Sequence, residues 1–124
     1  MTKGSRKERR RSPRANVRTK VEVDYQIDSE DTFLFEYITD ISRDGIFLQT
    51  RTPLEIGTQL VLKFDLPDEG RSIHAVGKVI WINPYRPKGE NLNPGMGIEF
   101  LNLSNEDKEA IGRLVGKKAY LTDD

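Results

Sequence analysis

The arginines near the N-terminus are the side chains best suited to hold an anionic ligand. Residues 9–14 read Arg-Arg-Arg-Ser-Pro-Arg, which places Arg10 and Arg14 in an Arg-x-x-x-Arg spacing. A guanidinium group is a planar fork that matches phosphate oxygens, and equally the O6/N7 edge of guanine, with two parallel hydrogen bonds. It also stacks on the face of a purine. The segment therefore indicates a grip on a compact phosphate ligand that carries purine bases.

A second group of polar residues has the pattern Asp-x-Ser-x-x-Gly. Asp40, Ser42 and Gly45 fall in a short turn between two expected strands. In one interpretation, Asp and Ser bond the backbone of their own turn, and the glycine supplies a positive φ angle. In the other, Asp40 accepts hydrogen bonds from a guanine or orients an arginine that does so. Ser42 then bonds a phosphate or a base edge, and Gly45 lets a ligand approach the backbone.

The charge of the chain is distributed unevenly. Twenty Lys and Arg residues balance twenty Asp and Glu residues overall. The first twenty positions, however, hold nine basic residues and one acid, a net charge of +8, so residues 21–124 carry −8. A basic segment on an acidic body favours an anionic partner. The alternative is a solvated, disordered tail, because residues 1–16 have almost no hydrophobic content.

Several classes of function lack the residues that they need. The chain has no cysteine and a single histidine, His74, which excludes a disulfide framework and a cysteine-based zinc site. No nucleophile-elbow pattern is present, and Gly95-x-Gly97 lacks the third glycine of a dinucleotide fingerprint. We therefore expect no enzyme, no metal and no cofactor. No apolar run could span a membrane and no secretory leader is visible, so we expect a cytoplasmic protein without membrane insertion.

Strands are expected to position these groups, because apolar and polar residues alternate along much of the chain. The pattern is longest from Val17 to Ile27, and Phe33, Phe35 and Tyr37 share one face of the next strand. With turn residues between the segments, the alternation predicts strands over 17–27, 33–39, 46–50, 59–66, 72–82 and 96–103. Residues 83–94 contain three prolines, a glycine and three asparagines, and predict a mobile loop.

One helix is expected, over residues 104–117. Ser104 can cap it, and acidic residues in the first turn suit the helix dipole. Ile111, Leu114 and Val115 form one apolar stripe, and Gly116 followed by two lysines suits a C-terminal end. Six strands and a helix predict an all-β fold with a C-terminal helix, namely a six-stranded antiparallel β-barrel whose helix covers one open end or flank. Residues 1–16 would form a flexible arm and residues 17–124 the barrel domain.

In their order and spacing, these features resemble the PilZ domain, a bacterial receptor for the second messenger cyclic di-GMP. The resemblance includes the Arg-x-x-x-Arg arm before the first strand and the Asp-x-Ser-x-x-Gly turn between the second and third strands. It continues through Gly95-Met96-Gly97-Ile98-Glu99-Phe100 and the helix that follows. It covers nearly the whole chain, and the chain looks most like the stand-alone, single-domain members. The family fold implied is a split-barrel type of β-barrel.

The resemblance also implies roles for individual residues. Arg10 and Arg14 would clamp the phosphates and guanines of cyclic di-GMP. Asp40, Ser42 and Gly45 would form the opposing wall on the barrel. The arm would be loose when empty, would wrap over the bound ligand, and would thereby signal to a downstream protein partner.

Two further positions are implied with more than one interpretation. Arg9 is similar to a family position that sets ligand stoichiometry, and a basic residue there looks like the version that accepts a stacked pair of ligand molecules. Arg11 could share that role. Gly97 lies near the ligand in one interpretation and is a packing glycine in the other.

Two other functions compete with a cyclic di-GMP receptor. The first is non-specific nucleic-acid binding by the basic arm, with steep salt dependence. Against it, the barrel is expected to expose no aromatic platform of the kind that stacks bases, so specific DNA or RNA binding is not expected. The second is a ligand-free protein–protein adaptor.

Overall fold

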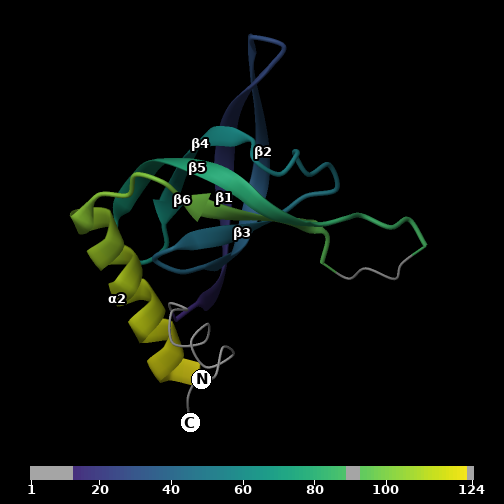
Figure 1. The fold of residues 1–124 in the computed structure, drawn as a ribbon. Helices are drawn as coiled ribbons and strands as arrows, with labels where there is room; N and C mark the ends of the chain where they lie inside the picture. The colour runs from purple at the N-terminus through teal and green to yellow at the C-terminus, as the bar shows by residue number, and fades with distance from the viewer. Residues whose placement is uncertain (1–12, 89–92, 123–124) are drawn as a thin grey trace, which may run out of the picture.

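The computed structural model describes residues 13–88 and 93–122, with side chains up to Lys118. In this part of the chain, six strands are followed by one helix, in the order expected from the sequence (Figure 1). The elements are β1 (Ala15–Ile27), β2 (Glu30–Ile41), β3 (Gly45–Gln49), β4 (Gln59–Leu66), β5 (Arg71–Asn83), β6 (Gly95–Phe100) and α2 (Asn105–Thr122).

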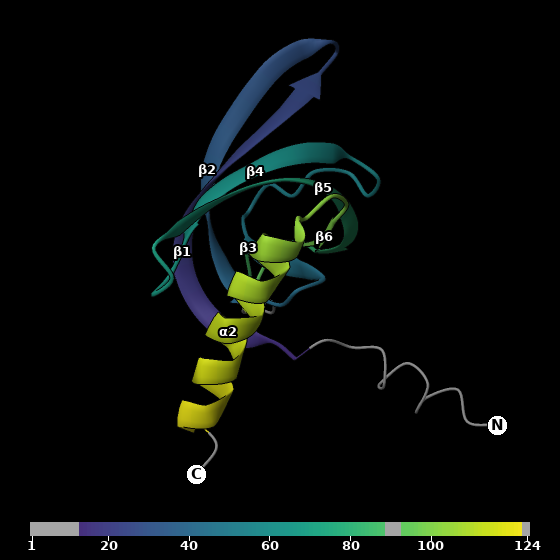
Figure 2. The ribbon, with the colours of Figure 1, turned by 90° about the vertical axis from the view of Figure 1, so that its left-hand side faces the viewer.

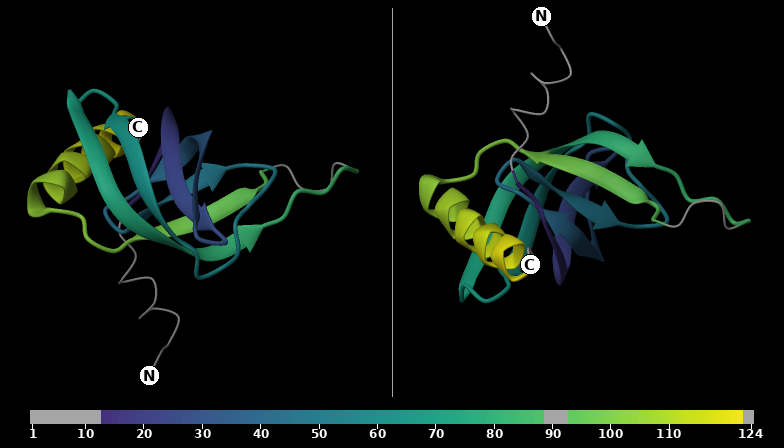
Figure 3. Two further views of the ribbon diagram at one scale, coloured as in Figure 1. Left: turned by 90° about the horizontal axis from the view of Figure 1, so that it is seen from above. Right: turned by 90° about the horizontal axis from the view of Figure 1, so that it is seen from below.

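The six strands form a closed barrel in the order β1-β2-β3-β6-β5-β4 (Figure 3). Every neighbouring pair is antiparallel. The prediction of a six-stranded antiparallel β-barrel is therefore confirmed. β3 lies between β2 and β6, which brings the turn after β2 next to the final strand.

The barrel core is built from the inward side chains of the alternating strands. Along β4, Leu60, Leu62, Phe64 and Leu66 are buried, whereas Val61 is more than a third exposed. A strand that turns successive side chains to opposite faces gives this pattern. The other strands add inward residues that include Val21, Val23, Ile38, Leu48, Ile73, Met96 and Ile98.

Helix α2 lies along one flank of the barrel (Figure 2). Ala110, Ile111, Leu114 and Val115 are buried there and join the barrel core, as the predicted apolar stripe requires. The backbone N–H of Asp107 donates to the Ser104 side chain at 3.0 Å, which confirms the expected cap.

The turn between β4 and β5 is fastened to this helix by ion pairs. Arg113 and Lys117 on α2 lie 3.1 Å and 3.4 Å from the Glu69 carboxylate, and Arg71 lies 2.7 Å from Asp107. The Glu69 side chain is only 8% exposed. Arg113 and Lys117 hold the pKa of Glu69 below its usual value, so the carboxylate stays ionised against the helix.

The predicted ends of the helix and of the last strand were wrong for identifiable reasons. The helix does not end at residue 117, because Gly116 does not adopt the left-handed conformation of a helix C-cap and the helix continues to Thr122. The last strand ends at Phe100 rather than at residue 103. Its continuation bends so that the Leu101 N–H bonds the Val76 carbonyl and the Asn102 side chain accepts from the Val76 N–H.

At the start of the barrel, β1 begins at Ala15, two residues before the expected start. Residues 1–12 of the predicted arm lie outside the described residues, so its flexibility stays a prediction. β2 is also longer than expected, because it pairs with β1 through a two-residue turn at Asp28 and Ser29. Both turn residues have positive φ, of 51° and 70°, as a tight hairpin turn requires.

Candidate functional site

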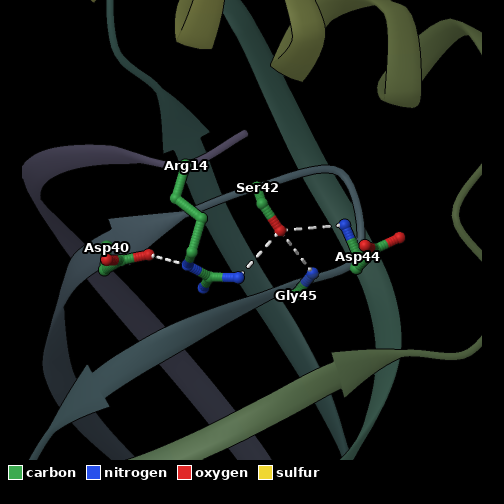
Figure 4. A network of polar contacts seen from close by, with 5 residues as sticks. All are labelled: Arg14, Asp40, Ser42, Asp44 and Gly45. Atoms are coloured by element: carbon green, nitrogen blue, oxygen red, sulfur yellow. Dashed lines mark hydrogen bonds and ion pairs between the residues drawn. The ribbon is translucent and has the colours of Figure 1, made fainter. Parts of the chain in front are cut away.

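Arg14 connects the start of β1 to the turn that follows β2 (Figure 4). Its Nε donates to Oδ1 of Asp40, with which it forms an ion pair, and its Nη1 donates to Oγ of Ser42 at 3.0 Å. The Arg14 and Asp40 side chains are 40% and 31% exposed, whereas Ser42 is fully buried. The structure thus brings three of the expected site residues into direct contact.

The Ser42 hydroxyl also organises its own turn. Its oxygen accepts from the backbone N–H of Asp44 at 3.1 Å and of Gly45 at 3.3 Å, and the Ser42 N–H donates to the Gly45 carbonyl at 2.9 Å. Ser42 therefore bonds the backbone of its own turn, as the local interpretation expects, while Asp40 and Ser42 both hold Arg14. Ser42 stabilises the turn and, from the same oxygen, fixes one nitrogen of Arg14.

A glycine is required at position 45 for a reason other than the positive φ angle expected there. Among the described glycines only Gly57 and Gly70 have positive φ. A β-carbon at Gly45 would lie 2.1 Å from the carbonyl oxygen of Ile98 on β6. A side chain is therefore excluded by the close approach of β3 and β6, and the glycine keeps the polar turn against the last strand.

A cleft of about 820 Å³ opens beside Arg14 on the outer surface of the barrel. Its rim is polar, and its floor is the β-sheet surface around Phe47 and Trp81. The residues that line it include Arg14, Asn16, Asp40, Asp44, Gly45, Phe47, Trp81, Asn83, Gly97 and Glu99. The cleft thus includes Gly97, which the sequence placed either near a ligand or in packing.

An aromatic pair forms part of the apolar lining of this cleft. The rings of Phe47 and Trp81 are stacked with centroids 5.3 Å apart, and Trp81 is 47% exposed. A β-carbon at Gly97 would lie 2.1 Å from Nε1 of Trp81, so this glycine makes room for the indole. Gly97 is therefore a packing glycine that also lines the cleft.

Sequence reasoning did not single out Trp81 as a site residue. The signal that would have found it is the combination of an exposed-face tryptophan with a glycine on the neighbouring strand. That neighbour relationship depends on a register shift in β5 between Val79 and Trp81, and alternation alone does not reveal such a bulge.

The described lining of the cleft is more acidic than basic. It carries the carboxylates of Asp40, Asp44 and Glu99, against the guanidinium of Arg14. Asp40 is already engaged by Arg14. Arg9 and Arg10 lie outside the described residues, and their expected place at the site stays a prediction.

The described residues contain no cluster of three or more His, Cys, Asp or Glu side chains placed to hold a metal ion. Over the same residues, no helix is long and apolar enough to cross a membrane.

Comparison with known families decides what kind of barrel carries this cleft. The family model described as the PilZ domain matches residues 8–117, which is most of the chain. The chain belongs to the PilZ domain family. The match starts upstream of β1 and ends within α2, so it includes both the arginine-rich segment and the turn at Asp40–Gly45.

Solved PilZ structures share the fold. The Bacillus subtilis inhibitor of motility MotI/DgrA superposes with a TM-score of 0.76 at 21% identity, over 93% of this chain and 53% of that one. The PilZ domain of Escherichia coli YcgR with c-di-GMP superposes with a TM-score of 0.64 at 20% identity, over 92% of this chain and 94% of that one. MrkH of K. pneumonia superposes with a TM-score of 0.67 at 18% identity, over 91% of this chain and 51% of that one. The chain thus spans about half the length of the first and third proteins. No curated protein sequence matches the chain.

The described part of this PilZ domain also exposes a row of aromatic rings, contrary to expectation. Phe33, Phe35 and Tyr37 share a face of β2, as the alternation predicted, but they are 61%, 52% and 38% exposed. Leu34 and Ile38 occupy the opposite, inward face. The expected absence of an exposed aromatic surface was wrong, because the face of β2 that carries these rings points away from the barrel core.

Proposed function

We propose that this PilZ domain is a cytoplasmic receptor that binds cyclic di-GMP in the cleft beside Arg14. The observation that carries the proposal is that Arg14, the second arginine of the Arg-x-x-x-Arg motif, lines the cleft together with Asp40 and is held there by Asp40 and by the buried Ser42. The family assignment supports it, and so does the likeness in fold to a YcgR domain described with c-di-GMP.

Arg14 and Arg10 would bind the phosphates and the guanine edges. Asp40 and Ser42 hold the Arg14 guanidinium by two of its nitrogens, and its remaining N–H groups can turn toward a ligand. Arg10 lies four residues upstream and would supply the second fork. Because three carboxylates and one guanidinium line the cleft, we expect the basic arm to contribute positive charge when phosphates bind there.

Phe47 and Trp81 would provide the apolar surface for a purine base. A purine ring can stack on an aromatic side chain, and such a contact contributes about 1–3 kcal/mol per base. Gly97 would act indirectly, because it sets the position of the indole. Gly45 would act in the same way on the turn that carries Ser42. Both glycines thus shape the site through packing.

The signal would arise from the arm. Binding would order residues that precede Arg14, neutralise part of their charge and create a surface for a downstream protein partner. Arg9 would recruit a second, stacked ligand molecule. This mechanism needs no bond to be made or broken, so we propose a binding module without catalysis or a cofactor.

Isothermal titration calorimetry with cyclic di-GMP tests the proposal. We expect binding by the wild-type chain and its loss in Arg10→Ala and in Arg14→Ala. Lys108→Ala, which removes a positive charge from the exposed side of α2, is the matched control and should bind normally. Normal binding by both arginine variants would overturn the proposed clamp.

Non-specific nucleic-acid binding is the competing function that the exposed aromatic row favours. It is distinguished by competition experiments. Under our proposal GMP, GTP and single-stranded oligonucleotides compete weakly against cyclic di-GMP at moderate salt. Strong displacement by an oligonucleotide of arbitrary sequence would favour the nucleic-acid function.

A further inference from the structure

Glu99 lies on β6 two positions after Gly97, and both residues line the cleft. Residues spaced by two in a strand point to the same face of the sheet, about 7 Å apart. Gly97 pairs with Trp81 on β5, and the indole lies against that glycine. The strand therefore carries a carboxylate a short distance from the aromatic floor of the cleft.

The Glu99 side chain is exposed, and no ion pair joins it to another described residue. The other two carboxylates of the cleft differ from it, because Asp40 is held by Arg14 and Asp44 is not free. Next to a phosphate, the charge of Glu99 opposes binding, whereas next to a hydrogen-bond donor it favours binding. Glu99 is therefore an acceptor that a donor group of a ligand can use.

The guanine bases of cyclic di-GMP carry such donor groups. The N1–H and the N2 amino group lie side by side on one edge of guanine, and the acceptors O6 and N7 lie on another edge. A carboxylate can accept from both donors at once, since it has two oxygens in one plane. Adenine has a lone pair at N1 in place of the N1–H, and a carboxylate repels it. A carboxylate thus distinguishes guanine from adenine.

Arg14 and Glu99 are both positioned beside Gly45. The Arg14 guanidinium donates to Ser42, whose oxygen also accepts from the Gly45 N–H (Figure 4). Across the sheet, Gly45 pairs with Glu99. The guanidinium and the Glu99 carboxylate are therefore carried to the same part of the cleft without forming an ion pair with each other. A base that lies between them meets a donor on one side and an acceptor on the other.

We propose that Glu99 binds the N1–H and the N2 amino group of a guanine that stacks on Trp81, and thereby makes the cleft selective for guanine. Arg14 receives the O6/N7 edge of the same base. Of the common purines only guanine offers acceptors to the arginine and paired donors to the carboxylate. This inference rests on the proposed function and adds to it the residue that determines base specificity.

A comparison of two ligands on two proteins tests this role by calorimetry. Cyclic di-IMP keeps O6, N7 and N1–H but lacks the N2 amino group. Wild type should bind cyclic di-GMP at least about tenfold more tightly than cyclic di-IMP, because a hydrogen bond to a charged acceptor is lost. Glu99→Gln should weaken the binding of cyclic di-GMP by at least about tenfold and bring the two ligands to within about threefold of each other.

Glu109→Gln is the matched control, since it makes the same change of charge at an exposed position of α2 outside the cleft lining. It should bind both nucleotides like wild type. Thermal melting should show that Glu99→Gln is folded, because the side chain that it replaces is exposed.

The same titrations separate a failure of this role from a failure of the proposed function. If wild type binds cyclic di-GMP and Glu99→Gln binds it equally well or more tightly, Glu99 makes no contact with guanine and its charge at most repels the phosphates. An equal loss for both nucleotides in Glu99→Gln also overturns the specificity role, and it leaves the receptor function intact. Wild type that binds neither nucleotide contradicts the receptor function itself.

Discussion

The indole of Trp81 lies across the backbone of Gly97, so close that a β-carbon at position 97 would be 2.1 Å from Nε1. The bulge in β5 between Val79 and Trp81 creates this pairing. One face of the indole stacks on Phe47, and the residue remains 47% exposed toward the cleft. The position of the aromatic floor is thus fixed from two sides before any ligand arrives.

Trp81 is the sole tryptophan of the chain, so its fluorescence should report on the cleft. We expect titration with cyclic di-GMP to quench or shift the emission of the wild-type chain, because a purine that stacks near the indole changes its environment. The dissociation constant from fluorescence should equal that from calorimetry. Binding by calorimetry with unchanged emission would place the ligand away from Trp81.

Gly97→Ala should damage both folding and the site. The added methyl collides with the indole, and overpacking of this kind costs about 1–3 kcal/mol in the free energy of unfolding. Urea denaturation measures that loss. The double variant Gly97→Ala/Trp81→Ala removes the collision partner and should recover part of the stability. If Gly97→Ala alone unfolds like wild type, the indole is free to move aside and does not have a fixed position.

Asp40→Asn should lower the affinity for cyclic di-GMP, whereas Ser42→Ala should lower the stability of the fold. Ser42 is buried and accepts from two backbone N–H groups, so its replacement should cost about 1–3 kcal/mol in the free energy of unfolding. The Arg14–Asp40 pair is part-exposed, and such pairs contribute only about 0–1 kcal/mol. Asp40→Asn should therefore remain stable but bind cyclic di-GMP more weakly, as denaturation and calorimetry would show. Unchanged affinity in Asp40→Asn would limit Asp40 to a structural role.

Acid should loosen the attachment of α2 through Glu69. Arg113 and Lys117 lower its pKa in the folded state, so the stabilisation from this carboxylate is complete above the usual value of 4.5. It is then lost as the pH falls through the lowered folded value. Thermal melting followed from neutral to acid pH should show a smaller loss in Glu69→Gln than in wild type. Asp68→Asn is the matched control, since Asp68 is exposed with a φ of 65° that asparagine tolerates, and it should retain the wild-type acid response.

Alternation predicted the strands well where one side of a strand is clearly apolar. The bounds of β4 agree with the expectation because Leu60 to Leu66 points every second side chain into the core. In β2 the same rule could identify a shared face for Phe33 and Phe35 but not its orientation. A period of two does not say which of two apolar faces is buried, and the pairing of the strand decides it.

The candidate site was predictable where its residues are close in sequence. Ser42 and Gly45 form one turn whose pattern is visible in the chain, and Arg14 contacts that turn directly. That the turn forms a wall opposite the arginines, with a ligand between them, stays a prediction. The role of Gly45 could not be found in this way, since the atom that excludes a side chain belongs to Ile98, on a strand more than fifty positions away. Trp81 was missed because its place beside Gly97 depends on the bulge in β5.

β1 begins at Ala15, directly after Arg14, so the second arginine of the motif is anchored at the edge of the barrel. The barrel immobilises the backbone beside Arg14 during folding, and Asp40 and Ser42 restrict its side chain as well. Little conformational entropy remains to be lost there when a ligand docks. Under the proposed function, an incoming nucleotide would therefore meet an Arg14 side chain that is already held in place.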